Sequence, residues 1–223
     1  MKVAIHQTGP IAGRCSEILL AEGRLTLLGV LDQNPQRPKT VRIDDLADWD
    51  VLVSDATDTD TILARATSAG IPLAVRGTVS TAVDIPVFSE ASLAAVARAI
   101  AATTTPRLIA ITAPGTPLRS GTSVAFPPPI GRLRAVSNSA GLLVAPTSGD
   151  WGGVVVEAAS ETIGVADQAA FVNAIALASA AIIMATTSNE PGIVDVGSIA
   201  DHYLEIAEAA GLEIARFRPA PTR

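Results

Sequence analysis

Short aliphatic runs alternate with helical patterns through the first hundred residues, and this alternation constrains the fold more than any other feature. Five runs are short enough for buried strands: residues 3–5, 25–31, 51–53, 71–75 and 86–88. Segments with a helical pattern lie between them, at 16–22, 59–69 and 92–102. Because parallel strands need crossover helices, this order predicts an α/β fold with a Rossmann-like, doubly wound parallel sheet.

The pattern changes beyond residue 105. Strand-like runs at 107–112, 142–145 and 153–159 precede a long alanine-rich helix at 166–185 and a last helix at 198–210. Residues 126–130 read Phe-Pro-Pro-Pro-Ile, which suits neither a helix interior nor a central strand, because proline lacks the backbone N–H. We therefore predict a Rossmann-like dinucleotide-binding domain over 1–105 and a smaller α+β domain with a mixed sheet over 106–223. Its last helix is free to pack back on the first domain.

Composition excludes several classes of protein. Acidic residues outnumber basic ones by 22 to 16, so we expect no nucleic-acid partner, because phosphate binding needs clustered Lys and Arg. Cys15 is the only cysteine and the two histidines lie far apart, so neither a disulfide nor a metal site is expected. The longest apolar stretch, 174–185, is shorter than the ~20 residues that span a bilayer. With no secretory pattern at the start, we expect a cytoplasmic protein without a membrane partner.

A turn after the first apolar run has the context of a phosphate-binding loop. Gly9 and Gly13 lie where the strand passes into a helix, whose N-terminal N–H groups attract a pyrophosphate. Arg14 adds a cation that can pair with phosphate. Asp32, at the end of the second run, is placed to accept the ribose hydroxyls of a dinucleotide. These four residues are our predicted cofactor contacts in this part of the chain.

The loop departs from the usual glycine pattern. Gln7 stands at the first glycine position, and Pro10 removes an N–H donor from the loop. The alternative is therefore a turn that only joins a strand to a helix and binds no cofactor. If a cofactor is bound, Asp32 favours NAD over NADP, although Arg37 and Arg42 leave NADP open.

Six short motifs follow one another along the chain. They are Asp55-Ala56-Thr57, Gly70-Ile71-Pro72-Leu73 with Gly77-Thr78, Ile85-Pro86-Val87 with Ser92-Leu93, Ser120-Gly121-Thr122, Phe171 with Ile175 to Ala178, and Pro191-Gly192-Ile193-Val194-Asp195. In these motifs and their order the chain resembles a known family, dihydrodipicolinate reductase (4-hydroxy-tetrahydrodipicolinate reductase) of lysine biosynthesis. Several of these features are also similar to saccharopine-dehydrogenase-like proteins.

The resemblance implies a nicotinamide near Thr57 and Gly77 and a substrate carboxylate at Ser120, Gly121 and Thr122, between the two domains. It also implies a tetramer formed through the sheet of the second domain. The family's His-His-x-x-Lys motif is missing, because Ile111, Thr112 and Gly115 occupy those places. We therefore expect a reaction other than the lysine-pathway reduction.

Four further residues are candidates for substrate binding or catalysis. Arg119 adjoins the Ser-Gly-Thr motif and can pair with a carboxylate, or it is simply solvated. Asp150 and Trp151 lie between glycine-rich turns, where Asp150 is a candidate acid and the Trp151 indole is a candidate cover for a ligand. The alternative is an ordinary hairpin tip. Glu157 lies inside a valine-rich strand and is a candidate acid if it faces inward. The alternative is an outward-facing, solvated Glu157.

These residues favour an NAD(P)H-dependent reductase of a small carboxylate-bearing imine or enamine. The alternatives are a non-redox cyclase or isomerase of specialised metabolism on the same scaffold, and a catalytically silent binding protein. We also expect a homo-oligomer, most plausibly a tetramer, because the helix at 166–185 and the strand Val154-Val155-Val156 carry much apolar surface. The opposing hypothesis is a monomer in which residues 126–130 cover that sheet.

Overall fold

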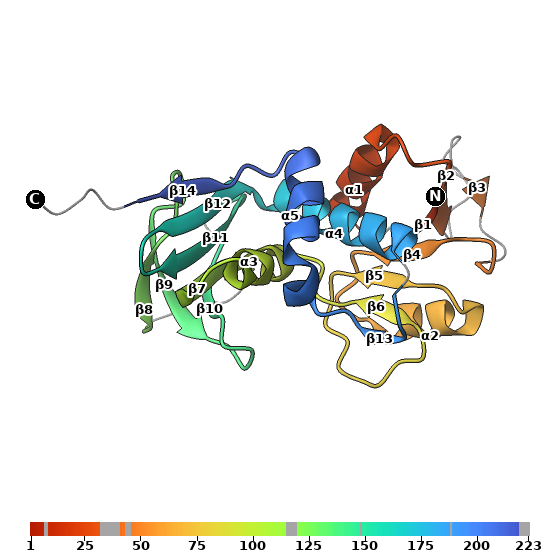
Figure 1. Cartoon of the computed structure of the whole chain (residues 1–223), viewed down its shortest axis with the longest axis horizontal. Helices are drawn as coiled ribbons and strands as arrows, with labels where there is room; N and C mark the ends of the chain where they lie inside the picture. Colours follow the sequence, from red (N-terminus) through yellow and green to blue (C-terminus); the bar gives the residue numbers. More distant parts are fainter. Residues whose placement is uncertain are drawn as a thin grey trace, which may run out of the picture. The chain divides into compact units, whose positions relative to one another are not determined.

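The computed structural model describes residues 1–6, 9–31, 41–42, 46–114, 120–147, 149–187 and 189–218. It contains two sheets (Figure 1), and the chain divides into two compact units. Unit 1 comprises Met1–Ser92 and Asn173–Asp195, and unit 2 comprises Leu93–Val172 and Val196–Arg223. These units differ from the predicted segments 1–105 and 106–223 in the helices around residues 93–102 and 173–186. The predicted domain boundaries remain a prediction.

Unit 1 is built on a seven-stranded sheet in which every pairing is parallel. The strand order is β3 (Val41–Arg42), β2 (Leu27–Leu31), β1 (Lys2–His6), β4 (Val51–Ser54), β5 (Leu73–Val75), β6 (Pro86–Phe88) and β13 (Gly192–Ile193). Helices α1 (Pro10–Ala21), α2 (Asp60–Ala69) and α4 (Ala169–Thr186) accompany it. The order reverses between β1 and β4, which is the switch point of a doubly wound sheet. The predicted Rossmann-like sheet is confirmed.

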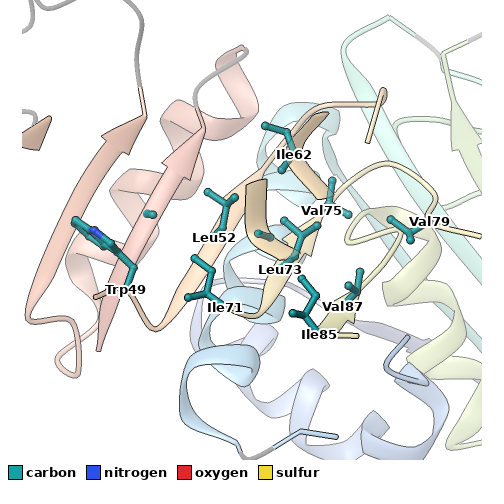
Figure 2. Packing of buried hydrophobic residues seen from close by; sticks show 11 residues of the cluster. Trp49, Leu52, Ile62, Ile71, Leu73, Val75, Val79, Ile85 and Val87 are labelled. Carbon is teal, nitrogen blue, oxygen red and sulfur yellow. The ribbon is translucent and has the colours of Figure 1, made fainter. Parts of the chain in front are cut away.

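One face of this sheet packs an aliphatic core around β4 and β5. Leu52 and Leu73 are fully buried, and Figure 2 shows them beside Ile71, Val75 and Val87. Ile62 from α2 closes the cluster, and α2 ends at Gly70, whose φ of 67° lies in the left-handed region. A sequence with only 3% aromatic residues builds such a core from branched aliphatic side chains.

Unit 2 contains a mixed sheet, as predicted. Its order is β14 (Ala215–Phe217), β12 (Thr162–Gln168), β11 (Trp151–Ala158), β7 (Pro106–Ala113), β10 (Leu143–Pro146), β9 (Arg132–Ser137) and β8 (Thr122–Ala125). Only β7 and β10 pair in parallel among these strands as described. Helix α3 (Leu93–Ala102) packs on β7 and β11, while the 3-10 helix η1 (Val196–Ile199) and α5 (Ala200–Ala209) pack on α3.

Two predicted helix boundaries are wrong. The long helix begins at Ala169 and not at residue 166, because the preceding residues form β12, the antiparallel partner of β11. β-Branched Thr162, Ile163 and Val165 suit that strand. The first helix begins at Pro10 and not at residue 16, since a proline is well tolerated in the first turn of a helix.

The proline-rich segment covers the middle of the unit 2 sheet. A Cβ on Gly153 of β11 would lie 2.5 Å from Ile130 Cδ1, and one on Gly164 of β12 would lie 2.5 Å from Pro127 Cγ. Val154, Val155 and Val156 are fully buried within the single chain. The predicted exposed apolar surface on this strand is therefore wrong, because residues 126–130 and α3 cover it. The homo-oligomer remains a prediction without that support.

Helix α4 is the one described helix that is long and apolar enough to cross a membrane. Of its 18-residue window, 67% is buried inside the protein. The core helix of a soluble protein meets the same criterion, so this helix is weak evidence for a membrane span. The cytoplasmic location remains a prediction.

Candidate functional site

The carboxyl edge of the unit 1 sheet collects the polar groups of several strands at the switch point. β1 ends at His6 and β4 ends at Ser54, and these two residues are register partners. The His6 Nδ1 and Ser54 Oγ atoms are 3.1 Å apart in a partly buried hydrogen bond. In open α/β sheets, ligands bind at the carboxyl ends of the strands beside such a switch point. This edge is the candidate site.

Helix α1 begins at this edge and receives its cap from a distant residue. Gly9 precedes it in an extended conformation, Pro10 opens it, and no side chain of its first turn is acidic. The Ala12 N–H donates instead to Asp55 Oδ2 over 3.4 Å. Gly9 lies against the same oxygen, since a Cβ there would be 3.3 Å from it. A carboxylate from the end of β4 thus stabilises the positive end of the α1 dipole.

Asp55 is buried, with a relative exposure of 3% for the whole residue. Its second oxygen, Oδ1, has no hydrogen-bond partner within the described chain. The nearby Cys15 thiol is fully buried, and burial and then the negative charge of Asp55 raise its pKa, so it stays protonated. Cys15 is therefore not a nucleophile in this structure.

Three loops at the edge are bonded to one another around Gly77. The Gly77 N–H donates to the Ala56 carbonyl over 3.1 Å, and the Gly77 carbonyl accepts from the Glu90 N–H over 3.1 Å. A Cβ on Gly77 would lie 2.7 Å from the Thr57 carbonyl oxygen. The predicted nicotinamide contacts Thr57 and Gly77 are thus brought together. Glu90 has a φ of 55°, a strained conformation of the kind that clusters at functional sites.

The structure describes two of the other predicted cofactor contacts, Gly13 and Arg14, but not the third, Asp32. Gly13 lies in the first turns of α1, and Arg14 pairs with the exposed Glu17 over 2.7 Å. Asp32 lies outside the described residues. The preceding Leu31 ends β2 and is the register partner of His6.

Replacing Gly13 with alanine is expected to raise the free energy of unfolding by about 1 kcal/mol, because alanine is the better helix former. No heavy atom would lie within 4 Å of the new Cβ. Urea unfolding of the variant measures the change. A loss of stability would show that Gly13 is required by packing.

The predicted substrate residues Ser120, Gly121 and Thr122 lie at the edge of the unit 2 sheet, where β8 begins. Gly121 has a φ of 145°, and a Cβ there would lie 2.4 Å from the Ala135 carbonyl oxygen. The close approach of β9 therefore requires this glycine. Ser120 and Thr122 are exposed, and the predicted Arg119 lies outside the described residues.

The predicted catalytic residues Asp150 and Glu157 are not brought together. Asp150 and Trp151 are exposed at the start of β11, while Glu157 is half-buried near its end. Trp151 and Glu157 are six residues apart on one strand, which corresponds to roughly 20 Å. A single small substrate cannot contact both.

Ile111 and Thr112, which the resemblance places where the family has its histidines, both lie in β7. Ile111 is buried in β7, and Thr112 Oγ1 accepts a hydrogen bond from the Gly153 N–H over 2.9 Å. This bond joins β7 to β11 inside unit 2. Ile111 and Thr112 therefore belong to the sheet interior, and Gly115 lies outside the described residues.

Arg76 was missed in the sequence analysis. It directly follows β5, is half-buried, and its Nε donates to the Asp55 main-chain carbonyl over 3.0 Å. The sequence signal that points to Arg76 is a charged residue immediately after a buried aliphatic strand. No described acidic side chain pairs with it.

Neither the cavity of unit 2 nor the described metal-ligating side chains extend the site. A cavity of about 230 Å³ in unit 2 is lined by Pro106, Arg107, Leu108, Ile109, Gly141 and Leu143, none of which was predicted to bind a ligand. Over the described part of the chain, no group of three His, Cys, Asp or Glu residues could hold a metal ion.

The described strands form a parallel sheet with the Rossmann strand order and a second, mixed sheet. Two solved structures have the same fold. Dipicolinate-bound dihydrodipicolinate reductase from Paenisporosarcina sp. TG-14 matches at 12% identity and a TM-score of 0.51, covering 89% of this chain and 99% of that one. C. glutamicum DAP dehydrogenase in complex with DAP matches at 13% identity and a TM-score of 0.52, covering 92% and 95%.

No family model matches the sequence, and no curated protein matches it. The two structural matches establish the fold, which is the dihydrodipicolinate-reductase fold that the motifs implied.

Proposed function

We propose that the protein is an oxidoreductase that uses a nicotinamide cofactor to reduce a small imine or enamine bearing a carboxylate. The carrying observation is the carboxyl edge of unit 1, where Gly77 joins the loops after β4, β5 and β6 beside a switch point of Rossmann type. The fold shared with a reductase and a dehydrogenase supports the same class of reaction.

The nicotinamide end of a cofactor suits this edge better than the diphosphate does. The Gly77 turn offers a close approach of backbone to a flat ring beside Thr57, and Asp32 would select NAD. Gly9, Gly13 and Arg14 would then contact parts of the cofactor other than its diphosphate. When bound, the reduced nicotinamide supplies a hydride.

The proposed substrate residues are on unit 2. Ser120 and Thr122 would hold a carboxylate with hydroxyl and backbone donors, with Arg119 adjacent. Trp151, four strands away on β11, remains a separate candidate. Asp150 and Glu157 remain separate candidates for the acid. Hydride addition to the carbon of a protonated C=N bond leaves its electron pair on nitrogen as an amine. Such a substrate needs little acid catalysis, which is consistent with the missing histidines.

NADH consumption with a panel of cyclic imine carboxylates tests this proposal. We expect substrate-dependent oxidation that falls at least severalfold, through a raised KM, in Thr122→Ala, because the carboxylate loses a hydroxyl donor. Ser123→Ala, on the next exposed position of the same strand, is the matched control. Consumption that is no faster than without the imines would contradict the proposal.

We expect negligible activity on the lysine-pathway intermediate, because Ile111 and Thr112 serve the sheet interior where the family has its histidines. Complementation of a bacterial strain that lacks dihydrodipicolinate reductase measures this directly. Growth without added lysine would show the expectation to be wrong.

A non-redox enzyme on the same scaffold is the second candidate function. The observation that favours it is the Asp55 carboxylate at the N-terminus of α1, where a dinucleotide fold places phosphate. Turnover of a substrate in the absence of NADH and NADPH would distinguish this candidate from a reductase.

A further inference from the structure

The N-terminus of α1 already holds an anion that belongs to the chain. Pro10 contributes no N–H, and the N–H of Ala12 is directed at Asp55 Oδ2. Bound phosphate in a dinucleotide fold uses these N–H groups and the positive end of the helix dipole. Both are engaged here by a buried carboxylate.

We propose that the anionic group of the ligand binds beside Arg76, and that Asp55 keeps oxyanions away from the N-terminus of α1. The inference rests on the proposed function for the identity of the ligand. The attraction and the repulsion that it describes involve residues of unit 1 alone. Asp55 and Arg76 are adjacent through the hydrogen bond from Arg76 Nε to the Asp55 carbonyl.

The repulsive part of the proposal follows from the surroundings of Asp55. The residue is 3% exposed, its Oδ1 has no hydrogen-bond partner among described residues, and no described cation pairs with it. Charges interact strongly where water is excluded, so a second anion at the start of α1 would meet a weakly screened like charge. A carboxylate with both oxygens paired to cations would not have this effect.

The attractive part follows from the way Arg76 is held. Its Nε is anchored to a main-chain carbonyl and its side chain is half-buried, so the guanidinium loses little freedom when a ligand binds. The remaining N–H donors form the planar fork that matches a carboxylate or a phosphate. This fork follows β5, beside the turn at Gly77.

The oxyanion has two sources, the diphosphate of a cofactor and the carboxylate of a substrate. Calorimetric titrations with inorganic pyrophosphate and with dipicolinate separate them. For at least one of these probes, Arg76→Gln is expected to weaken binding roughly tenfold. The probe that responds identifies the source.

Asp55→Asn is expected to strengthen pyrophosphate binding roughly tenfold, because it removes the charge while keeping an acceptor for Ala12. Asp58→Asn is the matched control, since it removes an exposed charge from the same loop. We expect little change from it, because solvent screens that charge. Thermal melts establish that each variant is folded.

A measurement on the unaltered protein avoids dependence on the variants. Pyrophosphate is added to labelled protein while the Ala12 amide and the Arg76 side-chain Nε resonances are followed. The Ala12 amide resonance is expected to stay in place at pyrophosphate concentrations that shift the Arg76 Nε resonance. If only the carboxylate binds beside Arg76, the Ala12 resonance is expected to stay in place at every pyrophosphate concentration. A pyrophosphate-induced shift of the Ala12 amide would overturn the repulsive part. Unchanged affinity of folded Arg76→Gln for both probes would overturn the attractive part. Neither pyrophosphate nor dipicolinate is a redox substrate here. Both results can therefore be interpreted even if the reductase proposal fails.

Discussion

Replacing Leu73 with alanine is expected to lower the free energy of unfolding by about 3 kcal/mol. Leu73 is fully buried in β5, where it is the register partner of Leu52 on one side and Val87 on the other. Figure 2 shows it within the aliphatic cluster. The shortened side chain leaves a cavity that neighbouring strands cannot fill without breaking their register.

The two tryptophans allow this loss to be assigned to unit 1. Trp49 belongs to the same cluster, and Trp151 lies in unit 2, so a Trp151→Phe background leaves Trp49 as the fluorescent reporter. Urea unfolding of Leu73→Ala in that background measures the change. Leu20→Ala, at a position 64% exposed, is the control and should alter stability by less than about 0.5 kcal/mol. Equal effects at both positions would contradict the described core.

Gly77→Ala is expected to cost about 2 kcal/mol of stability and to abolish measurable NADH binding. The added Cβ would lie 2.6 Å from Thr59 Cγ2, 2.7 Å from the Thr57 carbonyl and 2.9 Å from the Ala56 carbonyl. Two of these atoms are backbone, so the loops after β4 and β5 must separate. Those are the loops proposed to hold the nicotinamide.

Thermal unfolding and NADH titration test this variant together. Gly23→Ala is the control, because no heavy atom would lie within 4 Å of its new Cβ. It should change neither quantity appreciably. Unaltered stability of Gly77→Ala would mean that the three loops are not packed as described. Unaltered NADH affinity in a destabilised variant would remove Gly77 from the proposed site.

The parallel sheet of unit 1 could be predicted because each strand is a short aliphatic run and each crossover has a helical pattern. The end of α2 could also be predicted from local sequence, because a glycine such as Gly70 readily adopts the left-handed conformation that follows a helix. The last three residues of β12, 166–168, were mistaken for the start of α4, since Ala166 suits either structure until its pairing with β11 is known. Strand β8 is short and mostly exposed, so it has little apolar pattern to find.

The candidate site was predictable only where short motifs that carry the resemblance mark its residues. Thr57 and Gly77 both follow buried strands, and parallel strands bring their carboxyl ends to one edge. The bond from Ala12 to Asp55 joins residues 43 positions apart, and no local pattern reports it. The packing of residues 126–130 on β11 and β12 likewise joins segments that are distant in sequence. Such contacts depend on tertiary structure.

Calorimetric titration of the purified protein with NADH and with NADPH tests the central claim most directly. The proposed cofactor site predicts saturable binding of NADH, weaker binding of NADPH because Asp32 meets the 2′-phosphate with like charge, and loss of NADH binding in Gly77→Ala. Binding of neither nucleotide would contradict the claim that unit 1 holds a nicotinamide cofactor, and tighter binding of NADPH would contradict the role given to Asp32.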